Sequence, residues 1–81
     1  MRLRVLLFAE LRERAGWQER WLEITGTTTP LQLWSTIASE LGAEALLPER
    51  IRIAVNQQFA NPTVGLTDGD EVAFLPPISG G

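Results

Sequence analysis

A single helix with clear boundary signals constrains the fold of this 81-residue chain more than any other feature. Apolar residues recur at a spacing of four over residues 30–41, which predicts a helix with one broad apolar face. The apolar residues are Leu33, Ile37 and Leu41, with Leu31, Trp34 and Ala38 beside them. Thr29 is suited to the N-cap, Pro30 to the first helical position and Gly42 to the end of the helix. Such a helix must bury its apolar face against other elements.

Most other apolar residues alternate with polar ones, which is the period of β-strands. The alternation predicts strands over residues 2–8, 18–24, 51–55 and 71–75. Composition predicts a short helix over residues 9–15, and turn-forming residues predict turns at 56–57 and 67–70. Residues 60–66 show no regular pattern. The first strand is apolar on both faces near its end, which predicts an interior place in the sheet. Its short connection to the second strand favours antiparallel pairing of the two.

This order of elements predicts an α+β fold of the β-grasp, or ubiquitin-like, kind. We expect a mixed sheet of four to five strands, one long helix and short helical turns. A ferredoxin-like fold would need a second long helix, which the pattern does not supply. The chain is too short for a second core, so we expect one domain over residues 1–75. Residues 76–81 form an extended, flexible C-terminal segment, hereafter the tail.

The composition excludes most catalytic chemistry. Cysteine, histidine, lysine and tyrosine are absent, and all seven basic residues are arginine. Disulfides, zinc–thiolate sites, Schiff bases and the usual general base near neutral pH are therefore excluded. We predict no metal site and no cofactor bound by the chain itself. No apolar run has the length of a signal peptide core or a membrane span, so we expect a cytoplasmic protein with no membrane partner.

Charge is distributed unevenly along the chain. The net charge of −3 has the wrong sign for a nucleic-acid binder, so we expect no nucleic-acid partner. No basic residue follows Arg52, whereas Asp68, Asp70 and Glu71 do. The C-terminal third is thus anionic and predicts a basic surface on any partner that holds it. Three adjacent acids without further ligands are typical of a turn rather than a metal cluster.

The tail carries the main functional signal. Pro76 and Pro77 cannot continue a strand and hold the chain extended, so they project the residues that follow away from the sheet. Ile78 and Ser79 continue the segment, and two glycines end it. A backbone without side chains at Gly80 and Gly81 can enter a narrow active site and present its terminal carboxylate. The pattern predicts that this carboxylate is itself the reacting group.

Three segments carry a family resemblance. They are Val5-Leu6-Leu7-Phe8-Ala9 with Leu11-Arg12-Glu13, then Ala54-Val55-Asn56-Gln57, and finally Leu66 through Gly81. Together they resemble the MoaD family, the small subunits of molybdopterin synthase. The C-terminal block is the specific part, and Ile78 stands where the family usually carries valine. Residues 17–50 agree with the family in pattern rather than in motif.

The resemblance implies a sulfur carrier. A MoeB-type enzyme would use ATP to adenylate the Gly81 carboxylate, and sulfur would then replace AMP to leave a thiocarboxylate. The tail, from Pro76 to Gly80, would insert into the large subunit MoaE, in a heterotetramer of two small and two large subunits. Two transfers would convert cyclic pyranopterin monophosphate to molybdopterin. In this scheme the chain is the sulfur-donating subunit of a sulfurtransferase and supplies no catalytic side chain of its own.

Aromatic residues offer weaker candidates. Phe8, Phe74 and Leu75 lie near the predicted exit of the tail and are predicted to form an apolar partner interface, which the resemblance also implies. The alternative is that both phenylalanines belong to the core. The three tryptophans, at positions 17, 21 and 34, are predicted to be core or half-buried packing residues rather than a binding site.

Other functions remain open from the sequence. A carrier of the same fold can deliver sulfur to thiamin or to tRNA. A protein modifier would be attached through Gly81 to lysines of its targets, and the absence of lysine would prevent chains built on itself. An interaction module with an idle tail would function without its two terminal glycines.

Overall fold

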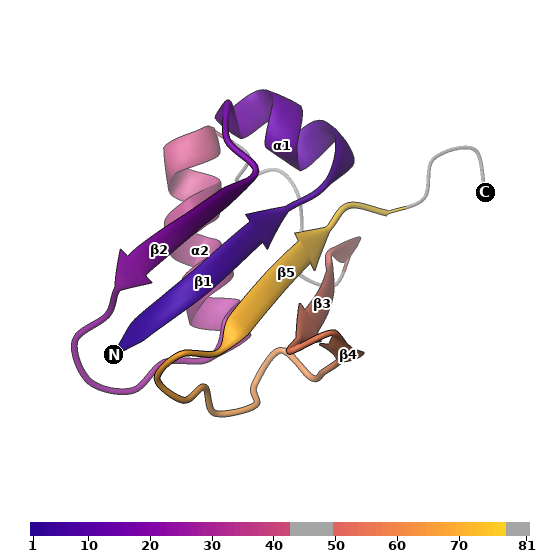
Figure 1. Cartoon of the computed structure of the whole chain (residues 1–81). Coiled ribbons are helices and arrows are strands. Elements are labelled where there is room, and N and C mark those ends of the chain that lie inside the picture. The colour runs from indigo at the N-terminus through magenta and orange to yellow at the C-terminus, as the bar shows by residue number, and fades with distance from the viewer. Residues whose placement is uncertain (43–49, 78–81) are drawn as a thin grey trace.

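The computed structural model describes residues 1–42 and 50–77 (Figure 1). Its elements are β1 (Arg2–Leu7), α1 (Ala9–Ala15), β2 (Glu19–Glu23), α2 (Pro30–Leu41), β3 (Arg52–Val55), β4 (Gln58–Phe59) and β5 (Glu71–Leu75). The predicted helix over residues 30–41 and the predicted last strand match α2 and β5 in both bounds. Neither helix of the described part has the length and apolarity needed to cross a membrane.

The boundaries of α2 follow from its capping residues. The Thr29 side chain accepts a hydrogen bond from the Gln32 backbone N–H at 3.2 Å, and Pro30 occupies the start of the helix. Gly42 adopts a left-handed φ of 67°, which ends the helix. Gly16 ends α1 in the same way with a φ of 81°. Both ends of α2 and the C-terminal end of α1 are therefore determined by nearby residues, as the sequence predicted.

The five strands form one mixed sheet in the order β2-β1-β5-β3-β4. The pairings β1–β2, β3–β5 and β3–β4 are antiparallel, whereas β1 and β5 are parallel. With α2 packed on this sheet, the chain has the predicted α+β, β-grasp architecture. The interior place of β1 and its antiparallel pairing with β2 are also confirmed.

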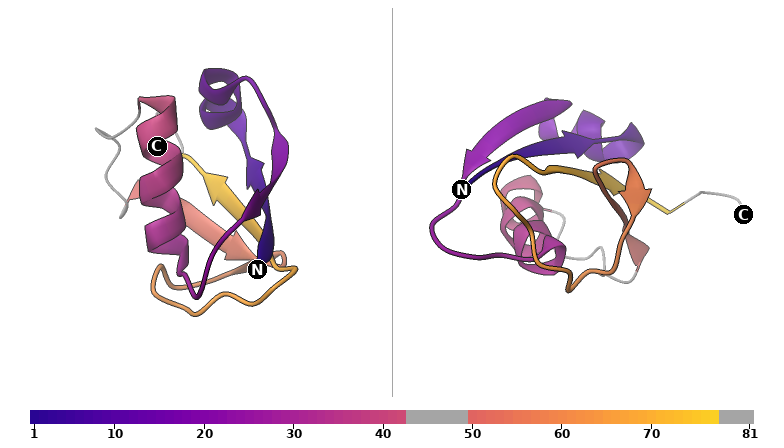
Figure 2. Two further views of the ribbon diagram at one scale, coloured as in Figure 1. Left: turned by 90° about the vertical axis from the view of Figure 1, so that its left-hand side faces the viewer. Right: turned by 60° about the horizontal axis from the view of Figure 1, so that its bottom comes forward.

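The core lies between the sheet and α2, which covers one face (Figure 2). Alternate strand residues point toward the helix and are fully buried. They include Leu3, Val5 and Leu7 of β1, and Val72 and Phe74 of β5. The Phe74 ring packs against that of Trp34, with 5.3 Å between ring centroids. Burial of one such side chain stabilises the fold by about 1.5–3 kcal/mol.

Sequence reasoning missed β4. Asn56 and Gln57 form the predicted turn with φ angles of 52° and 71°, and the chain then pairs again with β3 through Gln58 and Phe59. The Ala60 N–H extends this pairing by donating to Ile53 O at 3.0 Å. A two-residue strand is too short to show alternation, so no pattern could reveal it.

One prediction about the tryptophans is wrong. Trp34 is buried and Trp17 packs partly buried against the core, as expected. Trp21, however, is 45% exposed, because it alternates with Leu22 and points away from α2. The Arg2 guanidinium lies over its ring, 4.8 Å from the centroid.

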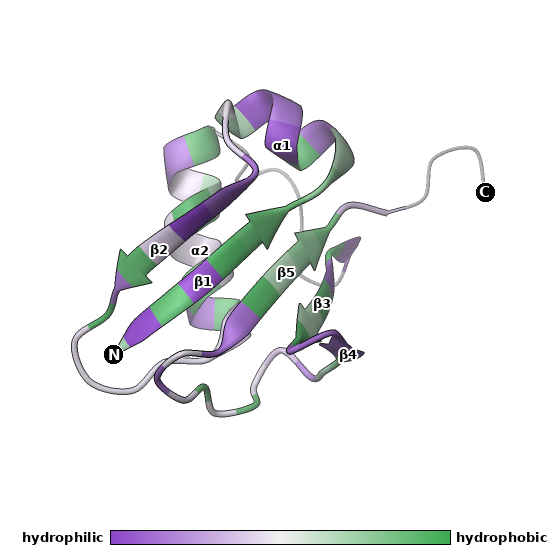
Figure 3. Ribbon diagram, in the orientation of Figure 1, coloured by the Kyte–Doolittle hydropathy of each residue, from purple (hydrophilic) through white to green (hydrophobic). Residues whose placement is uncertain are grey.

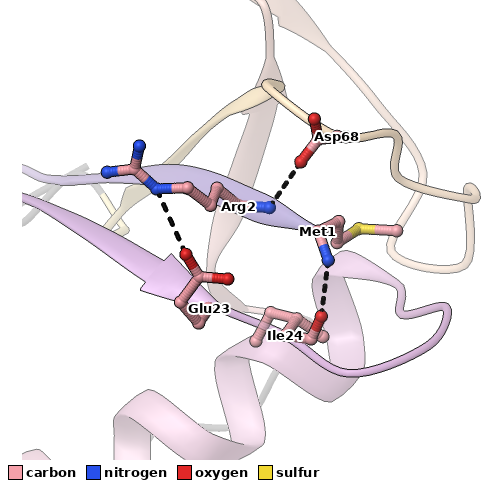
Figure 4. Close-up of polar contacts among 5 residues, drawn as sticks. All are labelled: Met1, Arg2, Glu23, Ile24 and Asp68. Atoms are coloured by element: carbon pink, nitrogen blue, oxygen red, sulfur yellow. Dashed lines mark hydrogen bonds and ion pairs between the residues drawn. The ribbon is translucent and has the colours of Figure 1, made fainter.

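The acidic residues before β5 bind the backbone, as the turn interpretation predicted. Asp68 Oδ1 accepts a hydrogen bond from the Arg2 N–H at 2.6 Å (Figure 4), and Asp70 Oδ2 accepts one from the Thr67 N–H at 2.8 Å. Asn56 donates from Nδ2 to Asp70 Oδ1 at 3.0 Å, and its Oδ1 accepts from the Glu71 N–H at 3.0 Å. These bonds fix the start of β5 between its two neighbours. In residues 1–42 and 50–77, no three acidic side chains come together as metal ligands would.

Candidate functional site

The tail leaves the domain from an interior strand. β5 lies between β1 and β3 and ends at Leu75, and Pro76 and Pro77 continue half-buried beyond it. Proline has no N–H to donate, so the ladder stops there. This end of the sheet lies opposite the end that carries Met1 (Figure 1). Ile78, Ser79, Gly80 and Gly81, predicted to complete the threaded arm, lie outside the described residues.

The three predicted interface residues differ in exposure. Phe8 is 39% exposed and Leu75 is half-buried, whereas Phe74 is completely buried in the core. The Phe74 side chain faces α2, because β5 alternates and Leu75 faces the other way. Phe74 therefore contributes packing beneath the exit of the tail and no exposed surface.

The face of the sheet turned away from α2 carries a row of apolar side chains near the tail. We call this the open face. Strand register places Leu6 beside Ala73, Ala73 beside Ala54, and Ala54 beside Phe59, so that the row crosses four strands. Two alanines lie between two larger side chains, and Phe59 is 66% exposed. The four side chains of the row are apolar, and the Arg52 guanidinium lies over the Phe59 ring at one end, 4.5 Å from the centroid.

Sequence reasoning missed Leu6 and Phe59 as surface residues. In β1, Leu6 alternates with the buried Val5 and Leu7, and this alternation alone places Leu6 on the other face of the sheet. Phe59 had no comparable signal, because its place beside Ala54 depends on the hairpin at Asn56-Gln57. Beside Phe59, Ala60, Asn61 and Val64 line a shallow hollow of about 440 Å³.

Hydrophilic residues lie along β2, in the first half of β1 and at the start of β5 (Figure 3). Arg52 of β3 lies opposite Leu75. Arg4 lies between two carboxylates, with Nη2 at 3.0 Å from Glu71 Oε1 and Nε at 3.6 Å from Glu19 Oε2. Arg2 pairs with Glu23 at 3.4 Å. Such exposed pairs stabilise the fold by at most about 1 kcal/mol each. Their opposite charges largely cancel on this part of the open face.

These features together define a ubiquitin-like β-grasp domain that presents its C-terminal segment beside an apolar surface. A model of the ThiS family matches residues 5–81. The molybdopterin synthase sulfur carrier subunit of Chlamydomonas reinhardtii is 38% identical over 84 residues, and the match covers 100% of both chains. That of Escherichia coli K12 is 38% identical over 82 residues, covering 98% of this chain and 99% of the relative. The chain belongs to the ThiS family, and the resemblance to the MoaD small subunits is confirmed.

Solved structures agree with this assignment. The crystal structure of SAMP1 from Haloferax volcanii has a TM-score of 0.82 and 26% identity, and the match covers 100% of both chains. A chain in the complex of subunits 1 and 2 of the molybdopterin-converting factor from Helicobacter pylori matches with a TM-score of 0.63 and 24% identity, over 100% of both chains. The second likeness concerns the fold alone.

Proposed function

We propose that this chain is the sulfur-carrier subunit of a molybdopterin synthase and that Gly81 carries the sulfur. The proposal rests on one observation: the end-to-end similarity to sulfur carrier subunits includes the tail, which continues from an interior strand beside the apolar row of the open face. The fold supplies a rigid base, and the tail supplies the reactive group. We expect the protein to act in the cytoplasm.

The chemistry requires no side chain of the carrier. The Gly81 carboxylate attacks the α-phosphate of ATP in a MoeB-type activating enzyme, which releases pyrophosphate and leaves an acyl-adenylate. A sulfur nucleophile then adds to the carbonyl carbon, AMP leaves, and a thiocarboxylate remains. ATP is thus a substrate of the activating enzyme and not a cofactor of this chain. The thiocarboxylate sulfur bonds to cyclic pyranopterin monophosphate, and water then cleaves the bond between the Gly81 acyl carbon and the sulfur, which regenerates the carboxylate. Two such transfers complete the dithiolene of molybdopterin.

The open face supports a large-subunit partner of the MoaE type. Leu6, Phe59 and Leu75, with Phe8 beside them, give an apolar surface next to the point where the tail begins. A partner that covers this surface would receive the tail in a fixed direction, because Pro76 and Pro77 hold it extended. The anionic C-terminal third favours basic residues on the partner around this contact. We expect two small and two large subunits in the complex.

The mass of the intact protein tests the proposal. After incubation with ATP, a MoeB-type enzyme and a sulfur donor, we expect a gain equal to the replacement of one oxygen by sulfur. The Gly81 deletion should show no gain while its circular dichroism spectrum stays unchanged. Addition of MoaE and the pterin precursor should then yield molybdopterin. An unchanged mass, with an activating enzyme shown to work on another carrier, would refute the sulfur-carrier proposal.

A protein modifier is the second candidate, favoured by the likeness to SAMP1, whose family name is small archaeal modifier protein. In that case the acyl-adenylate would be consumed by lysine side chains of other proteins. Covalent adducts in extracts of the native host that disappear with the Gly81 deletion would support this function. A thiocarboxylate without such adducts would support the carrier.

A further inference from the structure

We infer that this chain is unreactive toward its own activated C-terminus, so that the acyl group can be consumed only by a nucleophile from outside. The inference rests on the proposed activation of Gly81. An acyl-adenylate or thioester reacts with amines and thiols, and any such group on the carrier would compete with the sulfur donor. Three observations show that the chain offers almost none.

The first observation concerns the side chains. Lysine, cysteine and histidine are absent from all 81 residues, and each of the seven cations is an arginine. A guanidinium stays protonated in proteins and does not act as a nucleophile. Serine and threonine hydroxyls are weak nucleophiles unless a neighbouring base activates them, and no histidine can serve as that base. The α-amino group of Met1 is the one amine of the chain.

The second observation concerns that amine. Met1 N donates a hydrogen bond of 2.7 Å to Ile24 O in a partly buried position (Figure 4). The bond extends the ladder between β1 and β2 by one residue, and the Ile24 N–H donates in return to Met1 O at 2.7 Å. This bond and the partial burial hold the amine in place at the end of β1.

The third observation is distance. β1 and β5 run parallel, with Leu7 level with Phe74, and the six residue steps from Met1 to Leu7 span about 20 Å. The described chain continues beyond this level to Pro77, at the end of the sheet opposite Met1 (Figure 1). The four residues after Pro77 extend at most about 14 Å. The carboxyl group of Gly81 therefore cannot reach the amine of its own chain while the domain is folded.

A C-terminal thioester of the full chain tests the inference without an activating enzyme. In self-acylation an amine nitrogen bonds to the Gly81 carbonyl carbon, the C–S bond breaks, and the thiol leaves with the proton of the amine. The thioester of the natural sequence should yield only the acid, by hydrolysis. Linked dimers and cyclised chain should stay below a few per cent of the product in intact mass spectra.

Two lysine variants provide matched controls. Arg52 lies opposite Leu75, so the amine of Arg52→Lys lies within reach of the tail. Its thioester should cyclise at a rate independent of protein concentration, giving a product lighter than the acid by one water. Arg2→Lys places the same amine at the far end, beside Met1, and should give no cyclised product.

Cyclisation or dimerisation of the natural sequence at the rate of the Arg52→Lys variant would overturn the inference. So would equal cyclisation in both variants, because the argument from distance predicts a difference. The thioester forms without ATP or a sulfur donor. A failure here is therefore distinguishable from a failure to form the thiocarboxylate.

Discussion

Phe74 and Phe8 lie close to the exit of the tail but differ in burial, and alanine substitution should separate their roles. Phe74 is completely buried and packs on Trp34 at 5.3 Å, whereas Phe8 is 39% exposed. Removing a buried phenylalanine side chain costs about 3–5 kcal/mol, through lost burial and the cavity that remains. A domain of this length has a free energy of unfolding of about 4–12 kcal/mol, from about 0.05–0.15 kcal/mol per residue. Phe74→Ala should therefore remove a large share of the stability.

The matched control is Phe8→Ala, which makes the same chemical change at a partly exposed position. We expect it to lower the free energy of unfolding by about 1–2 kcal/mol, because Phe8 is only partly buried and leaves a smaller cavity than Phe74. Urea unfolding followed by far-ultraviolet circular dichroism measures both values. This probe avoids the change in Trp34 fluorescence that the loss of a neighbouring ring would cause.

The two variants should also differ in binding to MoaE. Phe8→Ala should weaken binding while the domain stays folded, and Phe74→Leu, which keeps the core filled, should bind almost as the natural sequence does. Equal losses of stability in Phe74→Ala and Phe8→Ala, within about 0.5 kcal/mol, would refute the assignment of Phe74 to the core and of Phe8 to the partly exposed surface.

Three further substitutions test other parts of the structure. Thr29→Ala removes the N-cap of α2 and should cost about 1 kcal/mol in urea unfolding, whereas Thr29→Ser should cost little; equal losses would contradict the capping role. Asn56→Ala removes two side-chain hydrogen bonds and places alanine at a left-handed φ. It should lower the free energy of unfolding by about 1–3 kcal/mol, and a decrease below about 0.5 kcal/mol would contradict this. Phe59→Ser, on the open face, should leave the unfolding midpoint nearly unchanged but weaken MoaE binding at least tenfold in titration calorimetry. Unchanged binding would place the partner elsewhere.

Local signals predicted most of the elements. The helix α2 begins and ends where Thr29, Pro30 and Gly42 allow it to, and each of these residues acts through its own backbone neighbours. The turn before β5 is similarly encoded, because the Asp70 carboxylate binds the Thr67 N–H three residues before it. Such features can be predicted from one sequence because the interacting groups lie within one turn of each other.

The surface around the tail could not be predicted in the same way. The row from Leu6 to Phe59 exists only because β5 inserts between β1 and β3 in a particular register. Register joins residues far apart in the sequence, and a single chain carries no direct record of it. Phe74 illustrates the limit. Its place near the exit of the tail was predicted from the sequence. Which face of the sheet its side chain occupies became clear only from the pairing of β5 with its neighbours.

The insertion of the last strand between the first and the third makes the completion of the sheet depend on the last part of the chain to be synthesised. Arg2 and Asp68, which are hydrogen-bonded in the folded domain, are separated by 66 positions. Contacts of such long range close late, so a growing chain cannot complete its sheet until almost all of it has been made. A product that stops before residue 71 lacks β5 as well as the tail, which leaves β1 and β3 without their shared neighbour and open to proteolysis. A chain truncated there would therefore lack both the completed sheet and the segment on which the proposed function depends.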